Sequence, residues 1–240
     1  MKMLPVLCVI GLVSLATNLC DGAALPLLSW YQMNGNGQDS LAHSPAMELD
    51  NVKFSRQALQ LPGPDYAYFT ANAFIPNLNY SNFTVAVDFA PCSVDYEHPT
   101  ILSCGPSYRW LTVVVDPWGR LQLELNNGSY VYSFTNQISS NRWHTLVCSV
   151  ELDEQRIVVF LNRRQVAVVP LFDFTFNVID TDYEREDKTF SFQNYGNATV
   201  LCGYVDNLRI YERALTAAEA QRVRVHPHTR ISLPTRARVQ

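Results

Sequence analysis

The sequence predicts an all-β protein, a sandwich of two antiparallel sheets with one short helix near the C-terminus. Three observations predict it. Short segments that alternate apolar and polar residues recur along the chain, separated by clusters of Gly, Pro, Asn and Asp. Only residues 216–225 carry a helical pattern. Apolar residues make up 48% of the chain, which is enough for a buried core. Many strands with a single helix favour two packed sheets.

The expected strands follow one another in the middle of the chain. Residues 83–89 alternate Phe and Val with Thr, Ala and Asp. Pro and Gly within 116–119 are typical of a tight turn, and Asn126-Asn127-Gly128 is a second hairpin signal. Further strands are expected at 101–104, 111–115, 121–125, 130–134, 143–150 and 157–169, the last two flanking a polar turn at 153–155.

The two ends of the chain differ from this middle part. Residues 1–24 have the pattern of a signal peptide, with Lys2 before an apolar run at 4–16 and small residues at 22–24. That run is short for a bilayer span, so a retained anchor is the less favoured alternative. We expect a secreted, extracellular domain at 25–225. Residues 226–240 form a basic extended tail, for which solvation is favoured over contact with a polyanion.

The charge and the cysteines exclude some functions. A net charge of −4 argues against nucleic acid as a partner. Four cysteines follow the signal segment, an even number in an oxidising compartment. Three pairings are possible, and we favour Cys92–Cys104, which bracket a short connection, with Cys148–Cys202 as the remainder. No C-x-x-C spacing is present, so zinc is disfavoured.

The most informative stretch is residues 203–219, which joins a strand to a helix start. Leu208 and Ile210 alternate with polar or amphipathic residues, and Thr216 with Glu219 forms a capping-box pair. The stretch resembles the closing strand of laminin-G-like, concanavalin-A-like jelly rolls, whose pattern is G-x-(I/L/V)-D-(D/N)-(V/L)-R-(I/V)-Y-x-R-A-L-(S/T)-x-x-E. The resemblance implies a jelly-roll β-sandwich and a binding module without catalytic machinery.

Other segments extend the resemblance in chain order over most of the expected domain. They are Trp30 to Gly35 with Gly37, Asp39 and Ser40; Ala58-Leu59-Gln60-Leu61 with Tyr66-Ala67-Tyr68-Phe69; Phe83-Thr84-Val85; Trp143-His144 with Val147; and Val159-Phe160-Leu161-Asn162. One departure is Arg163, where the family usually has Gly. Because Asn162 itself tolerates a positive φ, this departure affects only the turn geometry.

One short acidic run is the best catalytic candidate. Glu151-Leu152-Asp153-Glu154 resembles the E-x-D-x-E strand of laminarinase-type glucanases, whose carboxylates share one face. Here Gln155 stands where the third carboxylate should be, and the resemblance places the run in an exposed hairpin turn. No G-x-S-x-G, H-E-x-x-H or phosphate-binding glycine loop is present. His144 resembles a packing or hydrogen-bonding residue. We expect no enzyme.

Calcium is the cofactor that the resemblance implies. Related jelly rolls hold one ion between the opening loop and the closing strand, at positions that match Asp39 and Asp206. A second candidate is the acidic run Asp180, Asp182, Glu184, Glu186 and Asp187, for which a solvated loop is the alternative. Pentraxins place acidic ligands before the closing strand, where this chain has the uncharged Gln193-Asn194.

Sugar binding needs exposed aromatic faces. Trp118 is the first candidate, because it lies at the tip of a tight turn where a core residue would be unusual. Tyr108 and Trp110 lie one strand earlier and are further candidates. For Trp143 and for the trio Tyr130, Tyr132 and Phe134, which share one strand face, burial in the core is favoured over a binding platform.

Four sequons are candidate glycosylation sites, each in an expected loop or turn: Asn79, Asn82, Asn127 and Asn197. In a eukaryotic source we expect a glycan on Asn79 or Asn82.

Together these features predict a secreted, non-catalytic module that binds glycans or extracellular glycoproteins through one sheet face and nearby loops. The first alternative is a structural or adhesive component of an extracellular matrix. The second alternative is a glycan-cleaving enzyme of the laminarinase type. We expect no nucleic-acid partner and no membrane insertion.

Overall fold

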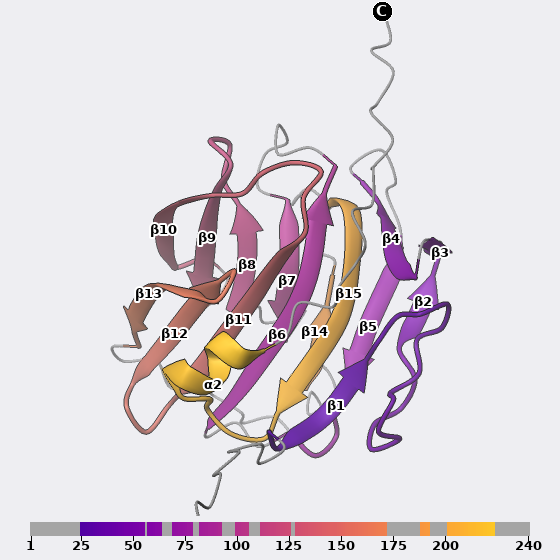
Figure 1. Ribbon diagram of the computed structural model, residues 1–240, viewed down its shortest axis with the longest axis horizontal. Coiled ribbons are helices and arrows are strands. Elements are labelled where there is room, and N and C mark those ends of the chain that lie inside the picture. Colours follow the sequence, from indigo (N-terminus) through magenta and orange to yellow (C-terminus); the bar gives the residue numbers. More distant parts are fainter. Residues whose placement is uncertain are drawn as a thin grey trace, which may run out of the picture.

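A computed structural model describes residues 25–55, 57–63, 69–78, 82–92, 99–105, 111–125, 128–171, 188–192 and 201–223. Two antiparallel sheets lie face to face in this part of the chain (Figure 1). The predicted fold class, a two-sheet sandwich with one short helix, is therefore confirmed. The described part of the chain contains no helix that is long and apolar enough to cross a bilayer.

Sheet A has eight strands and carries helix α2 on its outer face. Seven follow the order β13 (Arg164–Pro170), β12 (Arg156–Leu161), β11 (His144–Glu151), β6 (Asn82–Pro91), β15 (Cys202–Tyr211), β4 (Ala58–Pro62) and β3 (Lys53–Ser55), and β1 (Leu27–Tyr31) pairs with β15. Sheet B has seven strands, in the order β10 (Tyr130–Gln137), β9 (Arg120–Leu125), β8 (Leu111–Val115), β7 (Thr100–Cys104), β14 (Thr189–Ser191), β5 (Thr70–Phe74) and β2 (Glu48–Asp50).

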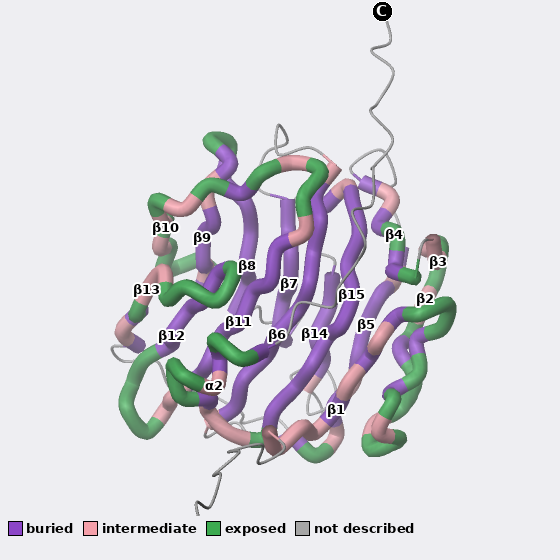
Figure 2. The backbone as a smooth tube through the Cα atoms, in the orientation of Figure 1, coloured by how far each residue is buried: buried purple, intermediate pink, exposed green. Residues whose placement is uncertain are grey.

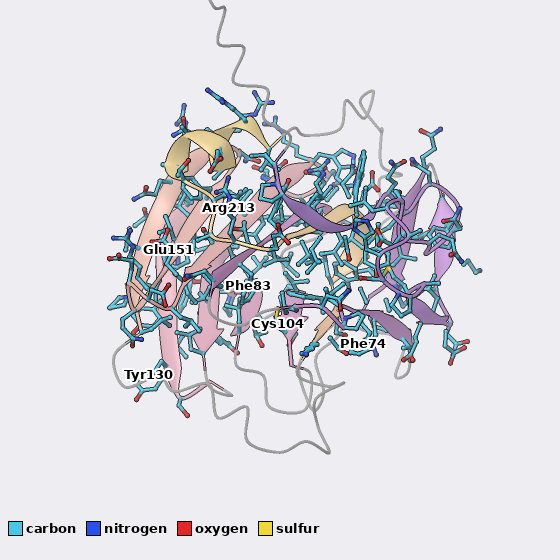
Figure 3. The ribbon with its side chains drawn as sticks, turned by 90° about the horizontal axis from the view of Figure 1, so that it is seen from below. Phe74, Phe83, Cys104, Tyr130, Glu151 and Arg213 are labelled. Atoms are coloured by element: carbon cyan, nitrogen blue, oxygen red, sulfur yellow. A yellow bond between two sulfur atoms is a disulfide. The ribbon has the colours of Figure 1, made fainter. Side chains whose placement is uncertain are left out.

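The core fills the space between the sheets, because alternate residues of each strand point inward. On β9, Leu121, Leu123 and Leu125 are buried in this core. Across it, the rings of Phe83 and Phe190 meet edge to face with centroids 6.3 Å apart. Figure 3 shows Phe83 and Cys104 between the two sheets. This alternation leaves a second, outer set of side chains on each sheet.

Helix α2 (Ala217–Arg222) begins as the sequence predicts. Thr216 is its N-cap, and Thr216 and Glu219 form both hydrogen bonds of the capping box. The helix packs on the outer face of sheet A through Ala220, together with Leu215 before it and Val223 after it. It ends at Arg222, so the helical part of the predicted range 216–225 is shorter than expected.

A pH dependence follows from the helix cap. Bidentate hydrogen bonds from Arg213, at 2.6 and 2.9 Å, are the main cause that lowers the pKa of Glu219 from 4.5 to about 2. A carboxyl whose folded pKa is depressed stabilises the fold above its unfolded pKa, and this contribution is lost as the pH falls through the folded value. The stability difference between wild type and Glu219→Gln in urea unfolding should therefore shrink between pH 4.5 and 2. Glu212→Gln, which removes an exposed carboxylate of the same segment, is the control. A difference that stays constant down to pH 2 would contradict the assignment.

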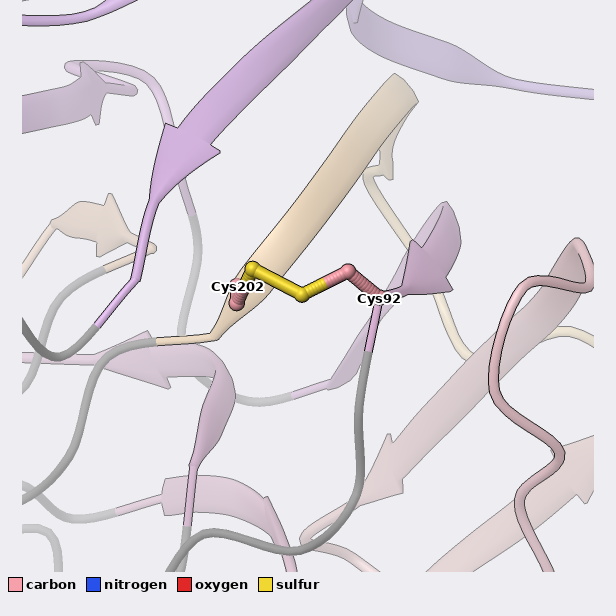
Figure 4. The surroundings of a disulfide bond; sticks show 2 residues. All are labelled: Cys92 and Cys202. Atoms are coloured by element: carbon pink, nitrogen blue, oxygen red, sulfur yellow. A yellow bond between two sulfur atoms is a disulfide. The ribbon is translucent and has the colours of Figure 1, made fainter. Parts of the chain in front are cut away.

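The predicted disulfide pairing is wrong. Cys92 bonds Cys202, joining the end of β6 to the start of β15 with the Cα atoms 5.5 Å apart (Figure 4). The two strands are neighbours in sheet A, and the backbone amide of Cys92 donates to the carbonyl of Cys202. Neither Cys92–Cys104 nor Cys148–Cys202 forms, because Cys104 lies on β7 of sheet B, where its side chain is in the core, and Cys148 lies inside β11.

Cys104 and Cys148 are free, buried thiols. Burial raises the pKa of Cys148 to about 12 and raises the pKa of Cys104 as well. Since the thiolate is the reactive form, both behave as small core residues rather than as nucleophiles.

The strand predicted at 157–169 is two strands, β12 and β13. They are separated by Asn162 and Arg163, whose φ angles are 51° and 68°. Two consecutive positive φ values are typical of a type I′ hairpin turn, in which Asn is favoured and Gly is the usual partner. The departure from the family at Arg163 therefore leaves the turn in place, with Arg163 itself in the left-handed region.

Candidate functional site

Trp118 is the most exposed large apolar residue of the described chain. Its side chain is 71% exposed and lies in the turn that joins β8 to β9. Figure 2 shows this turn as an exposed segment at the end of the two strands. The prediction that Trp118 stands in water at the tip of a tight turn is confirmed.

The turn is held by one buried carboxylate. Asp116 Oδ1 accepts the backbone N–H groups of Trp118, at 3.0 Å, and of Arg120, at 2.8 Å. Its Oδ2 accepts the Nε–H of Arg120 at 2.6 Å, and the Asp116 side chain is only 1% exposed. The Arg120 guanidinium in turn lies over the Trp118 ring, 4.7 Å from the centroid. Contacts within a single turn therefore position both the arginine and the tryptophan.

The turn is also tied to the next loop of the sandwich. The amide of Ile138 donates to the carbonyl of Gly119 at 2.7 Å, and Gln137 pairs with Arg120 across β10 and β9. In the same loop, the amide of Asn141 donates to the carbonyl of Pro91, next to the Cys92–Cys202 disulfide. The Trp118 turn thus belongs to an end of the sandwich that is cross-linked by backbone hydrogen bonds and a covalent bond.

The outer face of sheet B carries a transverse row of polar residues, which sequence reasoning missed. Strand register brings together, one from each of six neighbouring strands, Glu124, Thr112, Ser103, Ser191, Asn72 and Glu48. The alternation within each strand predicts that these residues face away from the core, but only the register shows that they are neighbours.

Most of this row is buried. Ser103, Thr112 and Ser191 are at most 1% exposed, and Asn72 is 8% exposed. Asn72 Oδ1 and, nearby on β7, Thr100 Oγ1 have no hydrogen-bond partner among the described residues. A buried polar atom without a partner is a place where water or a ligand group can bind. Exposed parts of sheet B include edge strand β10 and the Trp118 turn, which joins β8 to β9 at one end of the sheet.

The other aromatic candidates differ in how far they are buried. Tyr108 and Trp110 lie outside the described residues. Tyr132 and Phe134 are partly buried against the core, as expected. Tyr130, for which we expected burial, is 45% exposed, so that prediction is wrong: it begins edge strand β10, beyond the reach of the core (Figure 3).

Trp143 is partly buried and packs on a small cluster on the outer face of sheet A.

Asp39 organises the loop after β1. Its carboxylate accepts four backbone N–H groups, those of Trp30 and Leu41 on Oδ1 and those of His43 and Ser44 on Oδ2, at 2.8 to 3.2 Å. Only 7% of the residue is exposed. With both oxygens directed at N–H donors, Asp39 has little capacity left for a cation.

Asp206, the second calcium candidate, lies on β15 and is 1% exposed. Its carboxylate accepts the backbone and side-chain N–H groups of Asn207, and the same side-chain amide reaches Asp88 at 3.2 Å. Among the residues described, no three His, Cys, Asp or Glu side chains gather as metal ligands do. Asp39 and Asp206 as arranged do not fit a calcium site, and the acidic run 180–187 lies outside the described residues.

A substitution separates the two roles of Asp39. Asp39→Asn should lower the free energy of unfolding by about 2–3 kcal/mol, because the amide keeps only one acceptor oxygen for four partly buried donors. The exposed Asp50, which bonds the side chain of Asn51, supplies the control Asp50→Asn, expected to cost less than about 0.5 kcal/mol. Thermal unfolding with calcium and with a chelator should give the same midpoint. A midpoint that calcium raises in wild type but not in Asp39→Asn would show that Asp39 is a ligand after all.

The acidic run 151–154 lies in the hairpin between β11 and β12, as predicted. Glu151 pairs with Arg156 at 2.5 Å, and Asp153 accepts from Asn82 at 2.5 Å. At the opposite end of β11, His144 is 5% exposed, stacks on Phe89 and contacts Ser139 and Asn162. Burial lowers the pKa of His144. These contacts give Glu151, Asp153 and His144 structural partners.

Of the four sequons, only Asn82 lies among the described residues. The prediction that Asn82 lies in a loop or turn is wrong, because it is the first residue of β6. Its partner Asp153 belongs to the β11–β12 hairpin. Glycosylation at Asn79, Asn82, Asn127 and Asn197 remains a prediction.

Comparison with known proteins agrees with this geometry. A model of the concanavalin A-like lectin/glucanase superfamily, of the laminin G type, matches residues 63–221. A search of curated proteins returns no match. Among solved structures, the chain resembles domain 4 of AbnA, a GH43 extracellular arabinanase from Geobacillus stearothermophilus, in complex with arabinotriose. The TM-score is 0.62 at 16% identity, over 82% of this chain and 97% of that chain.

Two further structures share the fold within larger proteins. Trypanosoma rangeli sialidase has a TM-score of 0.62 at 14% identity, over 82% of this chain and 32% of that chain. The binding domain of botulinum neurotoxin DC, in complex with rat synaptotagmin II, has a TM-score of 0.58 at 10% identity, over 82% of this chain and 50% of that chain. At such identities the likeness shows the fold alone. By its matched residues and its two-sheet architecture, the chain belongs to the concanavalin A-like lectin/glucanase superfamily.

Proposed function

We propose that this chain is a secreted, non-catalytic recognition module that binds glycans, free or on extracellular glycoproteins, with Trp118 as the main contact. The observation that carries the proposal is a tryptophan with 71% of its surface in water, on a turn that a buried carboxylate holds in place. A tryptophan held in water on a rigid turn presents a large apolar ring face and an indole N–H to a partner.

The chemistry of the turn suits a sugar. The C–H faces of a pyranose or furanose ring pack on an indole, while its hydroxyl groups need hydrogen-bond donors and acceptors at the rim. Arg120 supplies such donors, since its guanidinium lies over one face of the ring. Because Asp116 fixes the turn before binding, little conformational entropy is lost when a ligand arrives.

The comparisons support the proposal at the level of the fold. The arabinanase domain was solved with arabinotriose, and the sialidase acts on sugars by its name. Neither ligand is assigned to this chain. The signal-peptide pattern of residues 1–24, which lie outside the described part, supports secretion.

A glycan array tests the proposal, with Trp118→Ala and Tyr130→Ala as a matched pair. Both variants remove an exposed aromatic ring. Trp118 lies in the β8–β9 turn, whereas Tyr130 begins β10 at the opposite end of β9. We expect wild type and Tyr130→Ala to bind the same glycans, and Trp118→Ala to lose at least about tenfold in affinity, the usual effect of removing a stacking contact. Absence of any glycan hit, or equal binding by Trp118→Ala, would overturn it.

The alternative of a glycan-cleaving enzyme predicts release of reducing sugar from β-glucans, abolished by Glu151→Gln. The bonds of Glu151 to Arg156 and of Asp153 to Asn82 argue against that role. We therefore expect no release above a heat-treated control, and the same result for Glu151→Gln.

A second candidate function, assembly into an extracellular matrix, is favoured by exposed apolar residues on two edge strands. Edge strands β10 and β13 are adjacent, and they carry Tyr130, Val131 and Val168, each 45 to 52% exposed. Size-exclusion chromatography of wild type and Val131→Lys, each with and without residues 225–240, measures self-association. A concentration-dependent larger species that Val131→Lys removes would support assembly through this edge.

A further inference from the structure

We propose that the Trp118 turn takes an acidic saccharide, whose carboxylate or sulfate binds the outer edge of the Arg120 guanidinium while the sugar ring packs on Trp118. This inference rests on the proposed glycan-binding function and names its ligand class. It follows from how Arg120 is held.

Arg120 uses only one of its three nitrogens for the fold. Nε donates to Asp116 Oδ2 at 2.6 Å. Within the part of the chain that the structure describes, Nη1 and Nη2 form no hydrogen bond, and 36% of the side chain is exposed. Fixing an arginine through Nε leaves the two terminal N–H groups parallel and pointing away from the carboxylate. That edge is the one that binds a carboxylate or sulfate with two hydrogen bonds.

The charge that faces solvent at this point is positive. Asp116 carries the opposite charge, but its side chain is 1% exposed and its oxygens accept three N–H donors. The buried anion is paired inside the turn with two backbone amides and with Nε of Arg120, while the terminal nitrogens of the same guanidinium extend over the Trp118 ring to the surface. A neutral sugar would leave the outer edge of this guanidinium, Nη1 and Nη2, with only water or hydroxyl partners.

The two contacts are close enough for a single sugar residue. The guanidinium carbon lies 4.7 Å from the Trp118 ring centroid. Because the guanidinium covers one face of the indole, the sugar ring packs on the opposite, exposed face, and its exocyclic acidic group reaches the guanidinium edge around the rim of the indole. Further along β9 the polar side chains bond one another, Gln122 to Glu124 and to Ser133, so they do not compete for Arg120.

Paired saccharides test the charge requirement. Isothermal titration would compare oligogalacturonate with its methyl ester, and sulfated dextran oligosaccharide with unmodified dextran oligosaccharide. The first pair varies a carboxylate and the second a sulfate on a constant backbone. We expect at least one acidic member to bind roughly tenfold or more tighter than its neutral counterpart, as a charge-assisted hydrogen-bond pair gives.

The variants are Arg120→Gln, Arg120→Lys and Arg142→Gln. Arg142 is an exposed arginine in the neighbouring loop 138–143, so Arg142→Gln makes the same change in net charge elsewhere. Arg120→Gln should abolish the preference for the acidic member, and Arg120→Lys should retain only part of it because the planar two-point contact is lost. Arg142→Gln should keep the preference. Circular dichroism and thermal unfolding verify that each variant is folded.

The outcomes separate this inference from the proposed function. Equal binding of acidic and neutral members that still depends on Trp118 overturns the acidic-ligand inference and leaves glycan binding standing. If Arg142→Gln loses the preference for the acidic saccharide as fully as Arg120→Gln does, the preference arises from diffuse charge attraction. That result also overturns the acidic-ligand inference. If none of the four saccharides binds and the glycan array gives no hit, both the acidic-ligand inference and the proposed glycan binding are overturned.

Discussion

Gly203→Ala is expected to destabilise the protein by about 3 kcal/mol or more, because it forces an atom into occupied space between β15 and β6. A Cβ at this position would lie 2.2 Å from the carbonyl oxygen of Ala90 and 2.9 Å from the Cα of Pro91. Both are backbone atoms of β6, which pairs with β15 here. Neither can move without breaking that ladder. The φ of 153° adds strain for any other residue.

Gly35→Ala is the matched control. Gly35 also has a positive φ, 95°, but its added Cβ would meet no atom within 4 Å beyond its chain neighbours, and the residue is exposed. This substitution should cost only the conformational term, about 1 kcal/mol. Urea unfolding followed by far-ultraviolet circular dichroism measures both. Equal effects at the two glycines would mean that close approach to β6 is not what fixes Gly203.

Breaking the Cys92–Cys202 bond is expected to cost about 3–5 kcal/mol, the usual range for a disulfide that closes a long loop. The bond spans 110 residues, so it removes much of the conformational freedom of the unfolded chain. It also anchors the end of the sandwich to which the Trp118 turn is hydrogen-bonded. Guanidinium unfolding of wild type and the double variant Cys92→Ser/Cys202→Ser would measure the loss.

Thiol mapping supplies the control for this pairing. In a non-reducing digest the peptides of Cys92 and Cys202 should stay linked. Cys104 and Cys148 should resist alkylation in the native protein and react after unfolding, since both are buried and burial raises their pKa. A Cys92–Cys104 peptide would contradict the structure.

The fold could be predicted because local and long-range signals in the sequence agree. In β15, Gly203 permits close packing on β6, and Leu208 and Ile210 fill the core. Asn207, with a φ of 50°, accommodates the irregularity between Asp206 and Arg209. Thr216 and Glu219 then cap α2. Each of these features is local and chemically specific.

The predictions that failed concern contacts between strands that are distant in the sequence. Cys92 and Cys202 are brought together by the β6–β15 pairing, which spacing along the chain does not reveal. The polar row across sheet B depends on the registers of six strands. Tyr130 escapes the core only because β10 is an edge strand. Asp39 resembles a calcium ligand in sequence, and only its four N–H partners reveal its role in the loop.

The candidate site was predicted in one part and missed in another. Trp118 could be found because a large aromatic at the tip of a Pro-Gly turn has nowhere to be buried. The role of Arg120 could not, since it depends on Asp116 taking Nε and leaving the outer edge of the guanidinium open.

Fluorine NMR of protein labelled with 5-fluorotryptophan tests the central claim, that Trp118 contacts the ligand, most directly. The chain has four tryptophans, and Trp118→Phe assigns one resonance to Trp118. Titration with the best array glycan should shift this resonance saturably, with the same Kd as calorimetry, while the signals of Trp30 and Trp143 stay in place. Saturable binding that leaves the Trp118 resonance unmoved would contradict the account.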